Sequence, residues 1–171
     1  VANDAFCRGG YIEKDIQQHY AGWLFYRSSA PGWPLGVTQA VNAPQGVSVA
    51  YTDSIPLLAV LCRPLAAALG GTFQYFGWFT LVCFAVQGGF AALLCGLFAE
   101  GLAAPLAGSL VFAASPILLE RAFRHTSLGA QWLVLAALYC YFVCRRQSRF
   151  ASRGLFVINI MAVGIHPYFL P

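Results

Sequence analysis

Charged residues are scarce in this sequence. Only 9% of the residues are Asp, Glu, Lys or Arg, whereas 59% are hydrophobic and the mean hydropathy is +0.66. Soluble globular proteins carry about 25% charged residues. The scarcity of charge therefore excludes an ordinary soluble domain and predicts an integral membrane protein.

The sequence also lacks the marks of a secreted or disulfide-bonded protein. No apolar stretch follows the N-terminus, as a cleavable signal peptide would require. Most of the six cysteines lie in apolar segments, where a thiol packs as a small hydrophobic group. The chain begins with Val1 rather than Met and stops at Pro171 inside an apolar segment, so we interpret it as a fragment of a longer chain.

Basic residues do not indicate a nucleic-acid-binding protein, although the net charge is +4. They gather in the run RRQSRFASR at residues 145–153, which separates two apolar segments. Lys and Arg concentrate on the cytoplasmic side of membrane helices. We therefore expect this run to be cytoplasmic, and we expect membrane lipids, and no nucleic acid, among the partners of the chain.

Apolar runs after the polar residues 1–53 predict an all-α, integral membrane helical bundle over residues 54–171. The expected membrane-spanning helices cover residues 72–98, 102–119, 127–144 and 154–170. The run at 54–69 is shorter and is interrupted by an Arg-Pro pair, so we predict an interfacial or re-entrant helix there. Helix parity, counted from the cytoplasmic Arg run, then puts residues 1–53 and 120–127 on the non-cytoplasmic face.

The stretch EKDIQQHYAGWLFYR at residues 13–27 predicts an amphipathic helix in the external loop. Helical spacing divides its side chains into a polar stripe and an aromatic stripe. The polar stripe contains Asp15, Gln18, His19, Gly22 and Tyr26, and the aromatic stripe contains Ile16, Tyr20, Trp23 and Arg27. We expect the aromatic stripe to be buried among lipid headgroups and neighbouring helices, and the polar stripe to face an aqueous pocket. Asp15 and His19, one turn apart, could share a metal ion or a proton; the alternative is an aromatic-belt helix with a solvated polar face.

Other polar residues lie at the predicted membrane boundaries. Asp53 precedes an apolar helix, where it either caps the helix or lies beside Asp15 across an external cavity. The polar segment ERAFRHTS, which contains Arg124 and His125, forms either a solvated loop or a second loop beside the active site. His166 lies in the last apolar segment, where an ionisable group is either a functional residue or a packing residue at a proline kink.

The motifs KDIQQHYAGWLFYR, PGWPLG and APQGVSVAYTDSIPLLAV, together with HPY near the C-terminus, resemble a family of bacterial multi-pass membrane proteins. That family is in turn similar to the GT-C class of glycosyltransferases, which use polyprenyl-phosphate sugars as donors. The resemblance implies a GT-C-like fold in the bacterial inner membrane, with a catalytic acid in the first external loop. Asp15 is the counterpart of that acid by position, although Lys14 stands where the family has Gly.

The resemblance therefore implies a membrane glycosyltransferase that transfers a sugar from a polyprenyl-phosphate donor, and helix parity puts the expected site on the non-cytoplasmic face. Asp15 is the expected general base, because such a transfer needs a carboxylate that accepts a proton. Guanidinium groups match the geometry of phosphate, and aromatic rings can stack on sugars. The expected substrate-binding residues are Gln18, His19, Trp23, Arg27, Asp53, Arg124, His125 and His166. A divalent metal cofactor stays open, as do two other functions: a polytopic transporter and a non-catalytic envelope assembly protein.

Overall fold

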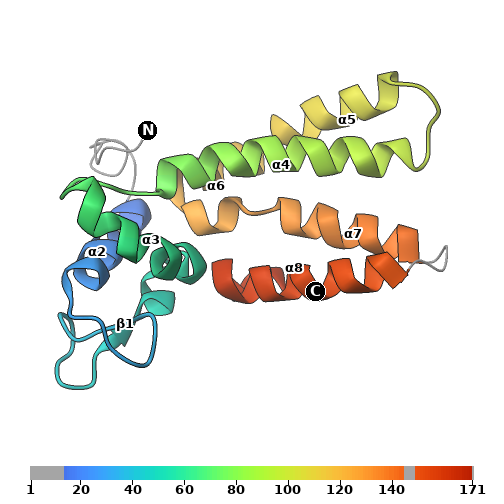
Figure 1. Ribbon diagram of the computed structural model, residues 1–171. Helices are drawn as coiled ribbons and strands as arrows, with labels where there is room; N and C mark the ends of the chain where they lie inside the picture. The colour runs from blue at the N-terminus through green and yellow to red at the C-terminus, as the bar shows by residue number, and fades with distance from the viewer. Residues whose placement is uncertain (1–13, 145–148, 171) are drawn as a thin grey trace.

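The computed structural model describes residues 14–144 and 149–170, and most of these residues are helical (Figure 1). The helical fold predicted from composition is confirmed at this level. Two predicted segments fall partly outside the described residues: the start of the external loop, residues 1–13, and the start of the Arg run, residues 145–148.

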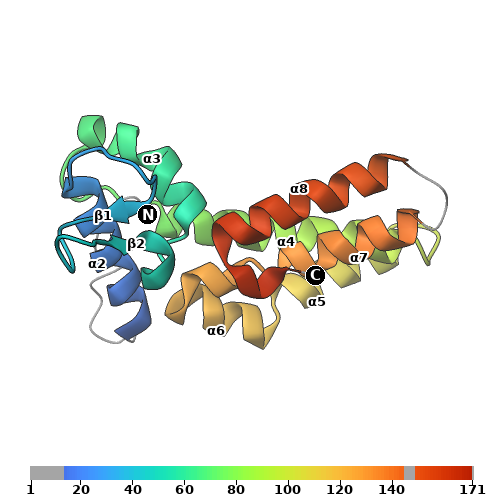
Figure 2. The same ribbon diagram turned by 90° about the horizontal axis from the view of Figure 1, so that it is seen from below.

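The first third of the described chain forms a compact N-terminal unit. Its elements are α2 (Lys14–Ser28), β1 (Val37–Thr38), β2 (Val47–Ser48), the 3-10 helix η1 (Val49–Thr52) and α3 (Pro56–Leu69). The two short strands pair antiparallel, with Val37 opposite Ser48. This unit lies at one end of the long helices, as Figure 2 shows from below.

The rest of the described chain forms an elongated helical bundle. Its elements are α4 (Phe76–Gly96), α5 (Ala103–Ala113), α6 (Pro116–Arg124), the 3-10 helix η2 (Thr126–Gly129), α7 (Trp132–Cys144), α8 (Arg149–Ile165) and the 3-10 helix η3 (Pro167–Phe169). Helix α4 packs against α5 and α7, and α7 packs against α8 (Figures 1 and 2). The N-terminal unit lies next to η2 and the C-terminal end of α8. The α4–α5 connection, the C-terminal end of α7 and the N-terminal end of α8 lie at the opposite end of the bundle.

Two helical segments of the described residues are long and apolar enough to cross a membrane: Phe76–Gly96 and Thr126–Val143. The pair α5 and α6 makes a third candidate if it is counted as one span, although the two helices are bent by 41°. Helices at Pro56–Ala66 and Ser152–Ile165 are apolar but shorter. The structure therefore has two or three candidate membrane spans.

The region 102–124 differs from its prediction. In place of one helix ending at residue 119, α5 ends at Ala113 and α6 begins at Pro116. Proline is favoured in the first turn of a helix, and Ser115 caps α6 by accepting a hydrogen bond from the Leu118 N–H at 3.2 Å. The expectation of a polar loop beginning at residue 120 is wrong, because residues 120–124 form the last turns of α6.

Helix α8 (Arg149–Ile165) begins and ends five residues earlier than the predicted helix at 154–170. It ends at Ile165, and residues 167–169 turn into η3. Pro167 explains the boundary, because it lacks an N–H and disfavours helical geometry in the residue before it. His166 therefore lies just after the C-terminal end of α8 and not inside the helix. This end of α8 is the one next to the N-terminal unit.

Helix α2 is held in place by its aromatic stripe and its last turn. Trp23 is fully buried, and its Nε1–H donates to the Phe73 carbonyl at 2.9 Å. Tyr20 is also buried, so the expected contact of these two rings with lipid headgroups is wrong and only the expected packing on neighbouring protein elements is found. The polar stripe is divided: Asp15 and Gln18 are exposed, whereas His19 and Tyr26 are each about 1% exposed.

Candidate functional site

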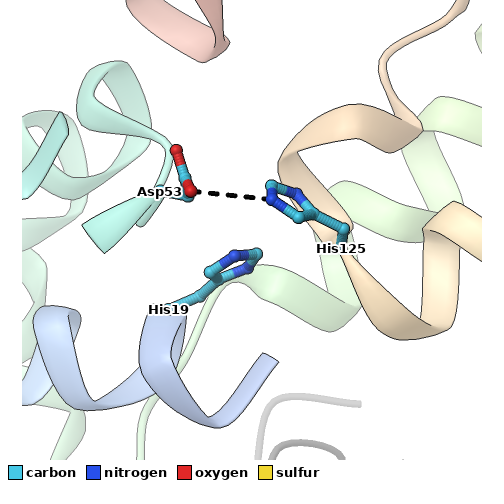
Figure 3. A group of neighbouring side chains, drawn as sticks. All are labelled: His19, Asp53 and His125. Atoms are coloured by element: carbon cyan, nitrogen blue, oxygen red, sulfur yellow. Dashed lines mark ion pairs between the residues drawn. The ribbon is translucent and has the colours of Figure 1, made fainter. Parts of the chain in front are cut away.

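All three histidines of the chain gather around the Asp53 carboxylate. His19 comes from α2, Asp53 follows η1, His125 joins α6 to η2, and His166 joins α8 to η3. We call these four residues the histidine–aspartate cluster. It lies where the N-terminal unit meets the bundle, and Figure 3 shows His19, Asp53 and His125 turned toward one another from separate elements.

The carboxylate contacts two imidazoles directly. Asp53 Oδ1 lies 3.3 Å from His166 Nε2, and Asp53 Oδ2 lies 3.6 Å from His125 Nε2. The His19 ring meets the His125 ring edge-on, with 4.6 Å between their centroids. The Asp53 side chain is 29% exposed, so the cluster is open to solvent on one side although His19 is buried.

Local backbone geometry places Asp53 in this position. Its φ of 52° and ψ of 27° are left-handed, a conformation that Asp tolerates better than most residues. The next residue ties this turn to α2, because Ser54 Oγ donates to the His19 carbonyl at 2.7 Å. Tyr75 donates its hydroxyl to the Ser54 carbonyl from the far side.

Gly22 allows α2 to approach this turn closely. A Cβ at position 22 would lie 2.1 Å from Thr52 Oγ1 and 2.5 Å from Ser54 Oγ, which are distances that real side chains do not adopt. The absence of a side chain at Gly22 therefore fixes how near His19 and Asp53 can come.

The helix-cap alternative for Asp53 is wrong. Ile55 occupies the N-cap position of α3 and makes no side-chain cap hydrogen bond, and Pro56 follows in the first turn. The Asp53 carboxylate instead points toward His125 and His166. The second sequence alternative placed it beside Asp15; its neighbour on α2 is His19, one turn further on.

The outer nitrogens of two histidines have their own partners. His125 Nδ1 lies 3.0 Å from Ser127 Oγ, and His166 Nδ1 accepts a hydrogen bond from the Tyr168 N–H at 3.3 Å. These contacts orient both rings so that each Nε2 faces Asp53.

His19 has no such partner. Its Nδ1 is buried and makes no hydrogen bond to any of the described residues. Burial, reinforced by the nearby His125 and His166, lowers the pKa of His19 to about 3. His19 is therefore a neutral imidazole near pH 7, and it carries a lone pair on one ring nitrogen.

These groups are suited to metal ligation. One ligand atom each from His19, Asp53 and His125 lies within 4.8 Å of the other two. Neutral imidazole and carboxylate are the usual nitrogen and oxygen ligands of transition metals. They can equally exchange protons with a substrate, because imidazole and carboxylate are the common general acids and bases.

Other predicted site residues lie outside the cluster. Asp15 is exposed in the first turn of α2, one turn before His19. Gln18 is exposed and lines a separate cavity of about 170 Å³. Arg124 is exposed on α6 and pairs with Glu120 at 3.3 Å, next in sequence to His125. Gln18 and Arg124 are each next in sequence to a member of the cluster, His19 and His125, but both side chains are exposed.

Trp23 and Arg27 make contacts within the fold; Arg27 also lines a cavity of about 500 Å³, so its predicted role in substrate binding stays a prediction. Trp23 is fully buried, so no face of its ring is open for a sugar. The Arg27 guanidinium donates to the backbone carbonyls of Ala66, Gly70, Gly71 and Phe73 at 2.6–3.1 Å. Two of these carbonyls, those of Ala66 and Gly70, belong to the C-terminal end of α3, where a positive charge is favoured. A phosphate bound to Arg27 would have to displace these hydrogen bonds.

Sequence reasoning named every member of the cluster, and its alternatives put Asp53 beside Asp15 and the His125 loop beside the active site, but it did not join Asp53 to the histidines. It paired His19 with Asp15, its helical neighbour, rather than with Asp53. It also missed Ser127 and Tyr168, which orient two of the rings. One signal was present in the sequence: the chain has only three histidines, and each falls near the same predicted side of the membrane.

Comparison with known proteins places the chain in a family. No curated protein and no solved structure matches it. One family model matches residues 1–171, which is the whole chain. The chain therefore belongs to the family described as Domain of unknown function (DUF6311).

Proposed function

We propose that this protein is a membrane glycosyltransferase of GT-C type, and that the histidine–aspartate cluster is its catalytic centre. The donor would be a sugar linked to polyprenyl phosphate. The main support for the proposal is that the partly exposed Asp53 carboxylate contacts two imidazoles at the end of a bundle of apolar helices. Such a position brings a general base to the boundary where a lipid-linked substrate presents its headgroup.

The reaction needs one proton acceptor. The acceptor oxygen attacks the anomeric carbon, the bond from that carbon to the phosphate oxygen breaks, and the polyprenyl phosphate leaves with the electron pair. Asp53 takes the proton that the acceptor hydroxyl loses. His166, with its Nε2 at 3.3 Å, holds the carboxylate in place, and His125, with its Nε2 at 3.6 Å, can accept the proton from Asp53 and pass it on to solvent.

The surroundings offer groups for the donor phosphate. Arg121 and Arg124 are exposed on the last turns of α6, directly before His125. Guanidinium groups bind phosphate oxygens through paired hydrogen bonds. The ion pair of Arg124 with Glu120 is exposed, and exposed ion pairs contribute little to stability.

An apolar cavity next to the cluster supports a lipid-linked substrate. It has a volume of about 490 Å³ and is lined by side chains of α7, α8 and η3, among them Leu138, Leu155 and Tyr168. Tyr168 connects this cavity to the cluster, because it lines the cavity and its ring centroid lies 4.5 Å from that of His166. A prenyl chain could lie there with its phosphate toward the cluster.

The proposal changes the expected general base from Asp15 to Asp53. Sugar transfer is measured with the purified full chain in liposomes that contain polyprenyl-phosphate sugars. Asp53→Asn keeps the shape of the side chain, and we expect it to lower the transfer rate by roughly 10²-fold or more, because general-base catalysis contributes about 10²–10⁴-fold. Asp15→Asn should have the smaller effect, since Asp15 is exposed one turn away.

Two results would count against this assignment. A larger loss in Asp15→Asn than in Asp53→Asn would return the role of base to Asp15. Wild-type protein that transfers no sugar from any of a panel of polyprenyl-phosphate donors would refute the glycosyltransferase proposal as a whole.

A further inference from the structure

We propose that His19, Asp53 and His125 bind one divalent transition-metal ion, with Zn²⁺ as the first choice, and that His166 orients Asp53 as a ligand. This deepens the proposed function by assigning a cofactor to the same site. The part that concerns catalysis rests on the proposed function, whereas metal binding is measured without any assay of sugar transfer.

The distances between the three ligand atoms are close to those of a zinc site. In a tetrahedral zinc site with bonds of about 2.0–2.1 Å, neighbouring ligand atoms lie roughly 3.3 Å apart. His125 Nε2 and Asp53 Oδ2 are already 3.6 Å apart, and all three ligand atoms lie within 4.8 Å of one another. Side-chain rotations that move the ligand atoms by about 1 Å would bring them to tetrahedral zinc geometry.

The hydrogen bonds leave one ring nitrogen of His125 and one of His19 without a hydrogen donor. If His125 Nδ1–H donates to Ser127 Oγ, its Nε2 carries a lone pair toward a carboxylate oxygen that also carries one. His19 is fully buried and its Nδ1 has no partner among the described residues. A cation between these three groups would satisfy all of them at once.

His166 fits the second layer of such a site. Its Nδ1 accepts the Tyr168 N–H, so a neutral His166 carries its proton on Nε2 and donates it to Asp53 Oδ1. Both nitrogens are then engaged, and neither can ligate a metal. An imidazole that hydrogen-bonds a ligating carboxylate is a common way to fix its orientation.

The ligand types select the metal class. Two imidazoles and one carboxylate suit Zn²⁺, Fe²⁺, Mn²⁺ or Co²⁺, whereas Mg²⁺ and Ca²⁺ prefer sites made of oxygen atoms. Three protein ligands leave at least one position open, as catalytic zinc sites do. In the proposed reaction this open position would take an oxygen of the donor phosphate and stabilise its charge as it leaves.

The test uses the full chain, purified in detergent, stripped with a chelator and titrated with Zn²⁺ or Co²⁺. We expect the wild type to bind one ion per chain, and bound Co²⁺ to give the intense visible absorption of a four-coordinate nitrogen and oxygen site. Zinc-edge X-ray absorption of the wild type should show imidazole ligands, and it requires no variant to fold. Absence of stoichiometric binding in the wild type would overturn the inference.

Four variants test the assignment of ligands. Asp53→Asn and His125→Gln should lose the bound ion. His166→Gln should still bind one ion with roughly 10- to 100-fold weaker affinity, which is the usual effect of removing a second-layer partner. Glu120→Gln, an exposed acid five residues before His125, is the matched control and should bind as the wild type does. Wild-type affinity in His125→Gln, or equal losses in Glu120→Gln, would contradict the site.

The two proposals can fail separately. Stoichiometric zinc in a protein that transfers no sugar would keep the metal site and refute the glycosyltransferase. Undiminished sugar transfer by the stripped protein would keep the glycosyltransferase and refute a catalytic metal.

Discussion

The two ends of α2 hold polar groups in contrasting ways. In its last turn the Arg27 guanidinium donates four hydrogen bonds to backbone carbonyls of residues 66–73. In its second turn His19 lies beside a carboxylate and His125, yet its buried Nδ1 has no hydrogen-bond partner among the described residues. Buried polar groups are normally paired, so an unpaired one needs a reason.

This contrast separates a site whose hydrogen bonds are complete from the site that we propose to be functional. The carbonyls around Arg27 need a donor whenever the protein is folded, and the arginine supplies it permanently. The histidine–aspartate cluster keeps an unmatched group next to a partly exposed carboxylate, which is the state expected of a site that completes itself with a ligand. Stability measurements should therefore respond to Arg27, and binding measurements to the cluster.

The largest effect on stability is expected from Arg27→Ala. Its removal leaves several carbonyls at the end of α3 without their charged donor, and hydrogen bonds to charged groups contribute about 1.5–3 kcal/mol each. We expect the free energy of unfolding to fall by about 3 kcal/mol in all, measured by denaturant titration in detergent. Arg27→Lys should recover part of the loss, because it keeps the charge but not the planar fork.

A small effect of Arg27→Ala would contradict the structural role given to this residue. If unfolding changed by less than about 1 kcal/mol, as for an exposed ion pair, the Arg27 contacts would not be structural and phosphate binding by this residue would be open again.

An intermediate effect is expected from Gly22→Ala, which acts on the turn that carries Asp53. The new Cβ would overlap Thr52 Oγ1, so residues 52–54 must shift away from α2. Overpacking of this kind typically costs about 1–3 kcal/mol. Because Asp53 moves with the turn, we also expect weaker Zn²⁺ binding by the cluster.

Gly89→Ala is the matched control for Gly22→Ala. Gly89 also lies in a helix, but a Cβ there would meet no atom within 4 Å. Alanine should be neutral or stabilise by up to about 1 kcal/mol through helix propensity alone. Equal destabilisation by both variants would mean that close approach at Gly22 does not matter.

The helical class was predictable from the sequence because it depends on composition and local periodicity. Scarce charge and long apolar runs were enough to predict a helical fold with candidate membrane spans. The break between α5 and α6 was readable in principle, since Ser115 and Pro116 form a helix-start signature. It was missed because the apolar run continues through it.

The cluster was only half predictable, because its members meet through tertiary packing. His19 and Asp15 share a helix face and could be paired by spacing, whereas the approach of Asp53 depends on Gly22 and on a left-handed turn. Arg27 illustrates the same limit: its charge suggested phosphate, but the end of α3 lies beside it only in the folded chain. Local rules identify candidate groups, and packing decides which of them already have partners.

The smallest effect on stability is expected from Arg124→Ala, which tests the proposed phosphate site beside the cluster. Arg124 is exposed and its ion pair with Glu120 contributes less than about 1 kcal/mol, so the free energy of unfolding should hardly change. Arg124 nevertheless adjoins His125, where the proposed donor phosphate binds. One basic residue near an anionic lipid surface contributes about 1 kcal/mol, so KM for the donor should rise roughly fivefold.

Arg153→Ala is the control, because Arg153 is exposed near the start of α8, the end of that helix opposite His166. Equal increases in KM for both variants would indicate general attraction to lipid rather than a phosphate site at the cluster.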